Sequence, residues 1–299
     1  MSEYHIPVMF QECIDALEIE KGGVYVDVTY GSGAHSRGIL DRLGEKGCLF
    51  SFDQDADGFD NISSDKRLVF IKSNFRYLYK MLRLEGVTKV DGLLADLGVS
   101  SHQLDFPERG FSFRFDAPLD MRMNERSDLT AKDVIRDYDA TRLQEIFSAF
   151  GEVRNARTLA QAIVKERGLR AIETTFDLNE VLEPLWKGLK NRYYAQVYQA
   201  LRMEVNEEMV VLEDMLKDVL RVLKPGGLLV VMSYHSLEDR AVKNFMKTGN
   251  VKGEMVKDDF GRIDRPFKIL TKKPVMASEE EVRRNPRARS AKLRVARRL

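Results

Sequence analysis

The sequence lacks the features that mark membrane, secreted and zinc-binding proteins. No apolar run approaches the roughly 20 residues that cross a bilayer. Its first residues, Met1 to His5, do not have the basic and then apolar layout of a signal peptide. Cys13 and Cys48 are the only cysteines, so neither a disulfide framework nor a structural zinc site is indicated. We therefore expect a soluble, cytoplasmic protein with no metal site of its own.

The chain contains enough apolar residues to form a large core. Its charges are also distributed unevenly along the sequence. Its 299 residues suggest roughly two domains. The net charge is only +1, yet every charged residue from Arg283 to Leu299 is basic. This stretch is either a phosphate-binding arm or a solvated tail. In the first case, its deletion should weaken binding to nucleic acid.

The chain is organised around a strand, a glycine-bearing turn and a helix. Val24 to Val28 alternate in the manner of a buried strand, Gly31-Ser32-Gly33 forms the turn, and Ser36 to Leu43 are helical in pattern. Such a turn brings the backbone close to a ligand, and the helix start supplies unpaired N–H donors. A tight loop without a ligand is the alternative interpretation.

A second strand, Cys48 to Phe52, ends at Asp53, whose carboxylate is placed to accept hydrogen bonds from ribose hydroxyls. A dinucleotide site would require a third glycine where the chain has Ser36. Because His35 and Ser36 are bulky beside a diphosphate, S-adenosylmethionine fits better than NAD.

Two further strands place side chains at the same sheet edge. Arg67 to Ile71 precede Phe75, which is suited either to covering an adenine ring or to core packing. Lys89 to Gly98 contain a strand that ends at Asp96. The long loop that follows, through Met123, is typical of a binding loop or lid.

From about Ser127 to Arg192 the pattern is helical, which predicts an all-helical insertion. We expect a Thr130–Asp133 cap, a helix that opens at Asp177-x-x-Glu180 and continues through Leu189, and a long helix from Val197 to Leu223. The insertion has a basic character that indicates either substrate contact or a solvated face, through Arg154, Arg157, Lys165, Arg167, Arg170, Lys187, Lys190 and Arg192.

After the insertion the α/β pattern resumes. Lys224-Pro-Gly-Gly leads into a strand from Leu228 to Ser233, then a helix through about Lys247 and a late strand from Pro266 to Thr271. The whole predicts a doubly wound parallel sheet interrupted by a helical domain. We place the domains at residues 1–125, 126–195 and 196–299, with the basic arm at the end of the last.

Several literal strings resemble motifs of the bacterial RsmH family, formerly MraW. The resemblance runs in order from His5 to Arg294 and rests on Asp27-Val-Thr-Tyr-Gly-Ser-Gly-Ala-His-Ser36, Asp96-Leu-Gly-Val-Ser-Ser101, Arg109-Gly-Phe-Ser-Phe113, Pro118-Leu-Asp-Met-Arg-Met123, Ala200-Leu-Arg202, His235-Ser-Leu-Glu-Asp-Arg240 and Asn285-Pro-Arg-Ala-Arg-Ser-Ala-Lys-Leu-Arg294. Two departures are visible: the family usually has glycine at Ala34 and phenylalanine at Tyr234.

The resemblance implies a Rossmann-like class I methyltransferase with an inserted all-helical domain. Family members transfer a methyl group from S-adenosylmethionine to the N4 amine of a cytidine in the decoding centre of 16S ribosomal RNA. The cofactor contacts that it implies fall on Gly33, Ala34, His35, Asp53, Phe75, Asp96 and Gln103. It also implies the small ribosomal subunit as partner, and leaves the oligomeric state open, a homodimer included.

The chemistry needs hydrogen-bond acceptors aimed at the amine, because the cytosine N4 lone pair is delocalised into the ring. We hypothesise that Asp96 and a nearby main-chain carbonyl supply part of this set, and that Asp120 and His235 are candidates for the remainder. Phe111 or Phe113 would stack on a flipped base. The alternatives are that Asp96 only binds the cofactor and that His235 makes a structural hydrogen bond.

Two other functions stay open at this point. DNA amino-methyltransferases carry an Asp/Asn-Pro-Pro-Tyr motif after the fourth strand, where this chain has Asp96-Leu97-Gly98-Val99. An RNA-binding assembly factor without catalysis is a second alternative, although the cofactor and loop motifs are all present. An ion held jointly with an RNA phosphate also stays open.

Overall fold

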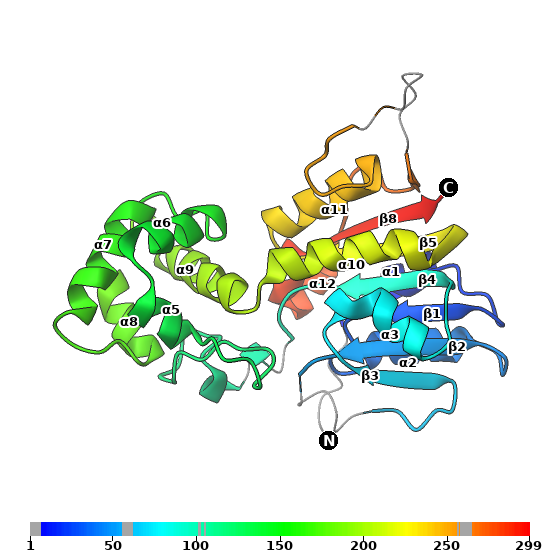
Figure 1. Ribbon diagram of the computed structural model, residues 1–299, viewed down its shortest axis with the longest axis horizontal. Helices are drawn as coiled ribbons and strands as arrows, with labels where there is room; N and C mark the ends of the chain where they lie inside the picture. The colour runs from blue at the N-terminus through cyan, green and yellow to red at the C-terminus, as the bar shows by residue number, and fades with distance from the viewer. Residues whose placement is uncertain (1–6, 56–61, 101–102, 105, 256, 258–264) are drawn as a thin grey trace. The chain divides into compact units, whose positions relative to one another are not determined.

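The structure, a computed structural model, describes residues 7–55, 62–100, 103–104, 106–255, 257 and 265–299. It forms two compact units (Figure 1): a sheet unit, Met1–Gly98 with Val210–Leu299, and a helical unit, Val99–Met209. The predicted boundaries at 125/126 and 195/196 fall inside the helical unit. Its core includes Leu119 and Met121 before the first boundary, and Val197 and Leu201 after the second. The lead-in residues His5 and Ile6, and Ser101, His102 and Asp105 of the long loop, lie outside the described residues.

The sheet unit confirms the doubly wound α/β prediction. Its strands follow the order β3-β2-β1-β4-β5-β8-β6, with β7 paired to β8. The first five in chain order pair in parallel, and β8 is antiparallel to β5. The strands are β1 (Val24–Asp27), β2 (Cys48–Asp53), β3 (Leu68–Lys72), β4 (Val90–Asp96), β5 (Leu223–Ser233), β6 (Phe267–Ile269), β7 (Val275–Met276) and β8 (Lys292–Arg298).

Helices cover both faces of this sheet because alternate residues of the inner strands are apolar on either side. Leu228, Val230 and Met232 of β5 pack in one buried cluster with α1 and α2 residues. In Figure 1, α3 and α10 lie on the viewer's face of the sheet. The helices are α1 (Phe10–Ala16), α2 (Ala34–Arg42), η2 (Phe75–Tyr77), α3 (Leu78–Leu84), α10 (Glu208–Val222), α11 (Ser236–Thr248), α12 (Glu279–Arg284) and η4 (Pro286–Ser290).

The C-terminal stretch is not the basic arm or solvated tail that its composition suggested. Lys292–Arg298 form β8, which lies between β5 and β6. Leu293 and Val295 pack into the cluster beneath α1, whereas Arg294 on the opposite face is buried against Asp239 of α11. Deleting Arg283 to Leu299 would therefore remove a sheet strand, so that deletion cannot report on nucleic-acid binding.

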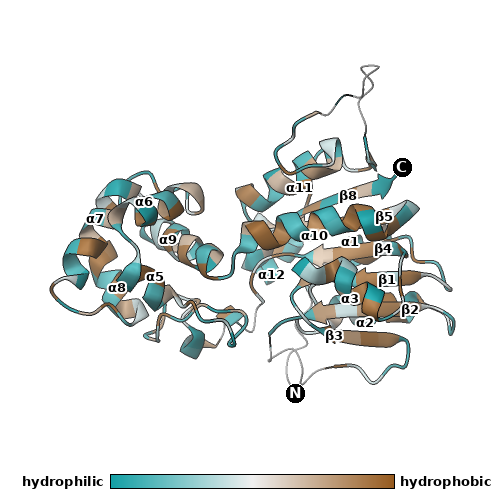
Figure 2. Cartoon of the chain, viewed as in Figure 1, coloured by the Kyte–Doolittle hydropathy of each residue, from teal (hydrophilic) through white to brown (hydrophobic). Residues whose placement is uncertain are grey.

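The helical unit confirms the expected all-helical insertion. Its helices pack around one buried cluster that includes Phe147, Leu159, Leu178, Val197 and Leu201. Figure 2 shows hydrophobic and hydrophilic residues interspersed along its helices, as amphipathic segments require. The elements are η3 (Pro107–Arg109), α5 (Ala131–Asp137), α6 (Ala140–Ala149), α7 (Ala156–Arg167), α8 (Thr175–Leu182) and α9 (Lys190–Val205).

Capping decides where these helices begin, and one prediction of a cap was wrong. The Thr130–Asp133 capping box is confirmed. For α8 the cap is Thr174, with Asp177 as its third helical residue rather than its first. The helix also ends at Leu182, because Pro184 follows one residue after its C-cap.

The predicted long helix from Val197 to Leu223 is two helices. The break falls at Asn206-Glu207, where Glu207 adopts a left-handed backbone with φ of 50°. Asn206 caps α9, and its side chain also accepts the Met123 N–H (2.7 Å) and donates to the Met121 carbonyl (2.8 Å). This side chain therefore ties the end of the loop to the helix. None of the helices in the described residues is long and apolar enough to cross a membrane.

Candidate functional site

The first turn of the sheet unit is fixed by a buried carboxylate. Asp27 ends β1, and its side chain accepts hydrogen bonds from the Thr29 N–H (3.1 Å) and the Ser36 hydroxyl (2.7 Å). Burial raises the pKa of Asp27. Sequence reasoning did not single this residue out, although a buried acid at the end of a strand beside a Gly-x-Gly turn is a signal that could have found it.

Glycine is the residue type that fits at position 33, in the turn after β1. Its φ is +74°, and an added Cβ would lie 2.5 Å from the Tyr30 hydroxyl oxygen. Gly33 is the N-cap of α2 and has no side chain to satisfy the first N–H groups of that helix. Ala34 and His35 are the first two residues of α2, so all three residues predicted from this motif meet at one helix start.

Asp53 lies at the tip of β2 and braces the same turn. Its carboxylate accepts the Gly31 N–H at 2.8 Å and the Asp55 N–H at 2.9 Å. Burial raises the pKa of Asp53 to about 6. The carboxylate is therefore ionised above that pH and protonated below it.

Phe75 stands at the tip of β3 beside the tip of β2. It begins η2, and the preceding Asn74 donates from its amide nitrogen to the Gln54 side chain at 2.8 Å. The Phe75 side chain is half-buried, which is compatible with both a ligand contact and core packing. The structure thus brings Phe75 close to the Asp53 segment.

Asp96 ends β4 and joins three elements. Its N–H donates to the Thr29 hydroxyl (2.7 Å), and its Oδ1 accepts the Tyr234 hydroxyl (2.9 Å). Its Oδ2 lies 3.7 Å from Nδ1 of His35. Burial, with smaller contributions from the charges of Asp27 and Glu238, raises the pKa of Asp96 to about 7. This carboxyl group titrates near neutral pH.

His35 is packed inside the sheet unit. Its ring stacks on Phe10 at a centroid distance of 5.9 Å and is 5% exposed. Burial lowers the pKa of His35, so the imidazole is neutral at pH 7. Its Nε2 atom is buried and has no hydrogen-bond partner among the described residues. A ligand contact from residue 35 would therefore come from its backbone rather than its ring.

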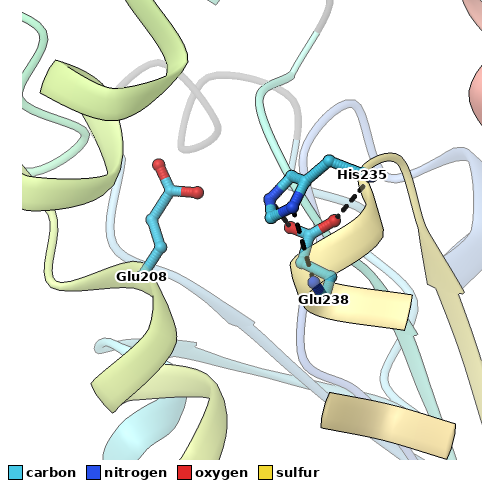
Figure 3. Close-up of side chains that lie close together, drawn as sticks. All are labelled: Glu208, His235 and Glu238. Atoms are coloured by element: carbon cyan, nitrogen blue, oxygen red, sulfur yellow. Dashed lines mark hydrogen bonds and ion pairs between the residues drawn. The ribbon is translucent and has the colours of Figure 1, made fainter. Parts of the chain in front are cut away.

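His235 has the structural hydrogen bond that the sequence left open. It is the N-cap of α11, where its Nδ1 accepts the Glu238 N–H at 3.4 Å. Its Nε2 lies 3.2 Å from Oε1 of the nearly buried Glu238, whose other oxygen accepts the Tyr234 N–H at 2.9 Å. Figure 3 shows the His235 ring and the Glu238 carboxylate side by side.

Gln103 and Asp120 belong to the helical unit and have partners there. Gln103 is buried, and its side-chain oxygen accepts the Ser100 N–H at 3.0 Å. Asp120 is held by two guanidinium hydrogen bonds from Arg122, at 2.9 and 2.7 Å. Although burial opposes the shift, these bonds lower the pKa of Asp120. Asp120 is thus ionised at neutral pH and engaged with Arg122.

Of the two aromatic residues proposed to stack on a base, Phe111 lies in the helical core and Phe113 is half-buried against it. Phe111 is 6% exposed and lies under the Arg109 guanidinium, 5.5 Å from its ring centroid. Phe113 packs edge-on against Tyr194 and Tyr198. For Phe111 the stacking hypothesis is wrong, because the ring is already buried in the helical core.

The family model and the curated relatives point to one family. A family described as the MraW methylase family matches residues 2–299. The chain is 54% identical to the ribosomal RNA small subunit methyltransferase H of Phocaeicola vulgatus, over 98% of this chain and 97% of that one. It is 53% identical to the Flavobacterium psychrophilum protein of the same name, over 96% of this chain and 99% of that one.

Solved structures are more distant. An rRNA methylase from Streptococcus thermophilus is 11% identical, with a TM-score of 0.42 over 100% of this chain and 99% of that chain. Fibrillarin from Aeropyrum pernix with bound S-adenosyl-L-methionine is 10% identical, with a TM-score of 0.39 over 96% of this chain and 73% of that chain.

Proposed function

The chain belongs to the MraW methylase family and is an S-adenosylmethionine-dependent methyltransferase of small-subunit ribosomal RNA, and we propose that its target is the N4 amine of a cytidine in the decoding centre. The observation that carries the proposal is the half-buried Asp96 carboxylate, at the strand edge that also presents Asp53 and the start of α2. A ribosomal substrate also favours the cytoplasm as its location.

The residues present fit a methyl sulfonium nucleoside. When bound, S-adenosylmethionine supplies an activated methyl group on a positively charged sulfur. We assign the ribose hydroxyls to Asp53, the adenine to Phe75, and backbone contacts to Gly33, Ala34 and His35. Gln103 stays a prediction from the family resemblance.

The charge of this edge supports the same choice of cofactor. Asp27, Asp53 and Asp96 end three neighbouring parallel strands, so three carboxyl groups meet at one side of the sheet. Negative charge attracts a sulfonium and repels a diphosphate. The acidic edge therefore favours S-adenosylmethionine over NAD.

We assign to Asp96 the role of accepting a hydrogen bond from the target amine. As the N–C bond forms, the nitrogen becomes positively charged and its protons become acidic, so an ionised acceptor stabilises the transition state. With a pKa of about 7, Asp96 is also suited to take up the released proton. Asp120 and His235 remain candidates for the rest of the acceptor set, although the hydrogen bonds of both are structural ones in the described residues.

Replacing Asp53 with asparagine should weaken cofactor binding about tenfold or more, because hydrogen bonds to a charged acceptor are the stronger ones. For the unaltered protein, affinity should fall as the pH drops through about 6, since protonated Asp53 loses acceptor capacity, and the Asp53→Asn variant should lack this step. Calorimetry with S-adenosylmethionine from pH 5 to 8 measures both effects. A pH-independent affinity would contradict the assignment of Asp53.

The RNA contacts that we propose come from a subset of the helical unit's cations. Arg167 donates to the carbonyls of Ile135 and Tyr138, and Arg170 pairs with Glu166 and Glu180. Arg154, Arg157, Lys187 and Arg192 are instead exposed and have no ion pair among the described residues. An exposed tryptophan, Trp186, precedes Lys187, and aromatic rings beside cations suit single-stranded RNA.

Changing Arg154 and Arg157 together to alanine should weaken binding to small-subunit RNA and flatten its salt dependence by about two counterions. Filter binding at several salt concentrations measures this slope. Arg167→Ala is not a suitable control, because it removes the hydrogen bonds from Arg167 to the Ile135 and Tyr138 carbonyls and could disturb the helical unit. Arg221, exposed on α10 of the sheet unit, is the matched control and should leave the slope unchanged.

The function itself is tested by mapping the product. The protein is incubated with labelled S-adenosylmethionine and either small-subunit particles, naked ribosomal RNA or DNA, and the modified base is identified by mass spectrometry. N4-methylcytidine at one position of the RNA is the expected result. Label in DNA, or RNA binding without any transfer, would replace the proposal with one of the alternatives from the sequence.

A further inference from the structure

We propose that Tyr234 is a positioning residue, whose hydroxyl group holds the Asp96 carboxylate in place and in its ionised form for methyl transfer. This inference rests on the proposed function, because it assumes that Asp96 serves the target amine. Its physical basis is a single hydrogen bond, 2.9 Å long, from the Tyr234 hydroxyl to Oδ1 of Asp96.

The two residues are brought together by the central strands. Asp96 ends β4 and lies opposite Met232 of the adjacent β5, and Tyr234 directly follows β5. Among the described residues, Tyr234 makes the only side-chain hydrogen bond to this carboxylate, because Nδ1 of His35 is too distant at 3.7 Å.

The hydroxyl is held in position from behind. The Tyr234 N–H donates to Oε2 of the nearly buried Glu238 at 2.9 Å, and the tyrosine packs against the cluster beneath α1. The hydrogen bond therefore fixes the Tyr234 backbone, and packing against the cluster restricts its ring.

The other groups around Asp96 do not stabilise its ionised form. Asp27 of β1 and Glu238 of α11 raise its pKa, as burial does, whereas the Tyr234 hydrogen bond lowers it. His35 of α2 is neutral, because burial lowers its pKa. Cys13 of α1 stays a protonated thiol, because burial and the Asp96 charge raise its pKa well above the usual value.

Tyr234 itself stays a donor over the whole working range. Burial, together with the charge of Asp96 and the hydrogen bond to it, raises the pKa of Tyr234. A phenol that does not ionise can stabilise a carboxylate without adding a charge of its own. The hydroxyl thus offsets part of the penalty that burial and two neighbouring acids impose on ionised Asp96.

The test is a Tyr234→Phe variant, which keeps the ring. Its Asp96 pKa, followed by 13C NMR of the labelled carboxyl group in the free protein, should rise by about one unit. The acid limb of kcat/KM with small-subunit particles should move up in pH by the same amount. The variant should then be about tenfold slower at pH 6 and near normal at pH 9.

Tyr25→Phe is the matched control, because it removes another buried hydroxyl of the sheet unit, one that accepts the Glu20 N–H at 2.8 Å. It should leave both the Asp96 titration and the acid limb unchanged. An unmoved Asp96 pKa in Tyr234→Phe, or a moved pKa with an unmoved acid limb, would overturn the inference. Failure of the proposed function would look different. The unaltered protein would then not methylate RNA, whereas the Asp96 pKa would still be higher in Tyr234→Phe than in the unaltered protein.

Discussion

Replacing Asp96 with asparagine is expected to lower the turnover of methyl transfer by about two orders of magnitude or more, with little change in overall structure. Asparagine has the size of aspartate, and its carbonyl oxygen can still accept the Tyr234 hydroxyl. It cannot carry negative charge, however, and one of its two heteroatoms becomes a donor. The amine would then face a partly repulsive group at the moment when its nitrogen becomes positive.

The kinetic constants distinguish the two roles of Asp96. If the carboxylate serves the target amine, kcat falls and calorimetric affinity for S-adenosylmethionine changes little. If it only binds the cofactor, affinity falls and saturating cofactor restores kcat. In the first case the pH dependence near 7 should also disappear, because the titrating group is gone. A variant with full turnover and full affinity would exclude both roles.

Asp91→Asn is the control for this experiment. Asp91 lies on the same strand as Asp96 but near its opposite end, where it accepts the Val24 N–H and pairs with Lys224. Its substitution removes a carboxylate from β4 without touching the proposed acceptor site. Turnover per folded molecule should therefore stay normal, with melting curves used to correct for any loss of stability.

The parts of the site that could be predicted from the sequence are those fixed by local pattern. A strand followed by Gly31-Ser32-Gly33 and a helix determines where the turn lies, and parallel strands place their terminal acids at one edge. Asp53 and Asp96 were predicted at strand ends for this reason, and β2 and β4 do end at these residues. Their pKa values could not be predicted, because burial and neighbouring charges arise only from tertiary packing.

The errors have the same origin. Charge composition alone suggested an arm at the C-terminus, yet Leu293 and Val295 supply an apolar face that becomes visible only beside β5. Helical periodicity continues across Asn206 and Glu207, so nothing local showed that Asn206 would bind the backbone of Met121 and Met123 instead. The error at Phe111 has the same cause, because the sequence alone does not show whether an aromatic ring in a loop is buried.

Replacing Arg294 with methionine is expected to destabilise the protein by about 3 kcal/mol. This is the lower end of the cost of breaking a buried ion pair, because Lys292 still lies 3.8 Å from the Asp239 carboxylate. The Arg294 guanidinium binds both oxygens of Asp239, at 2.6 and 3.1 Å, and the two side chains are only 7% and 16% exposed. The pair joins β8 to the first turn of α11, and thus joins two of the strings that carried the family resemblance.

Urea unfolding measures the loss, and two further variants establish its cause. Arg284→Met removes an arginine whose pair with Glu280 is exposed, and it should have no measurable effect on stability. Combining Arg294→Met with Asp239→Leu should recover part of the loss, because no buried charge is then left without its partner. The effects of the two substitutions on stability could instead simply add. The loss in Arg294→Met would then come from lost packing of the arginine stem and not from the unpaired Asp239 carboxylate. If Arg294→Met proved as stable as the unaltered protein, the closing strand of the sheet would not depend on this ion pair at all.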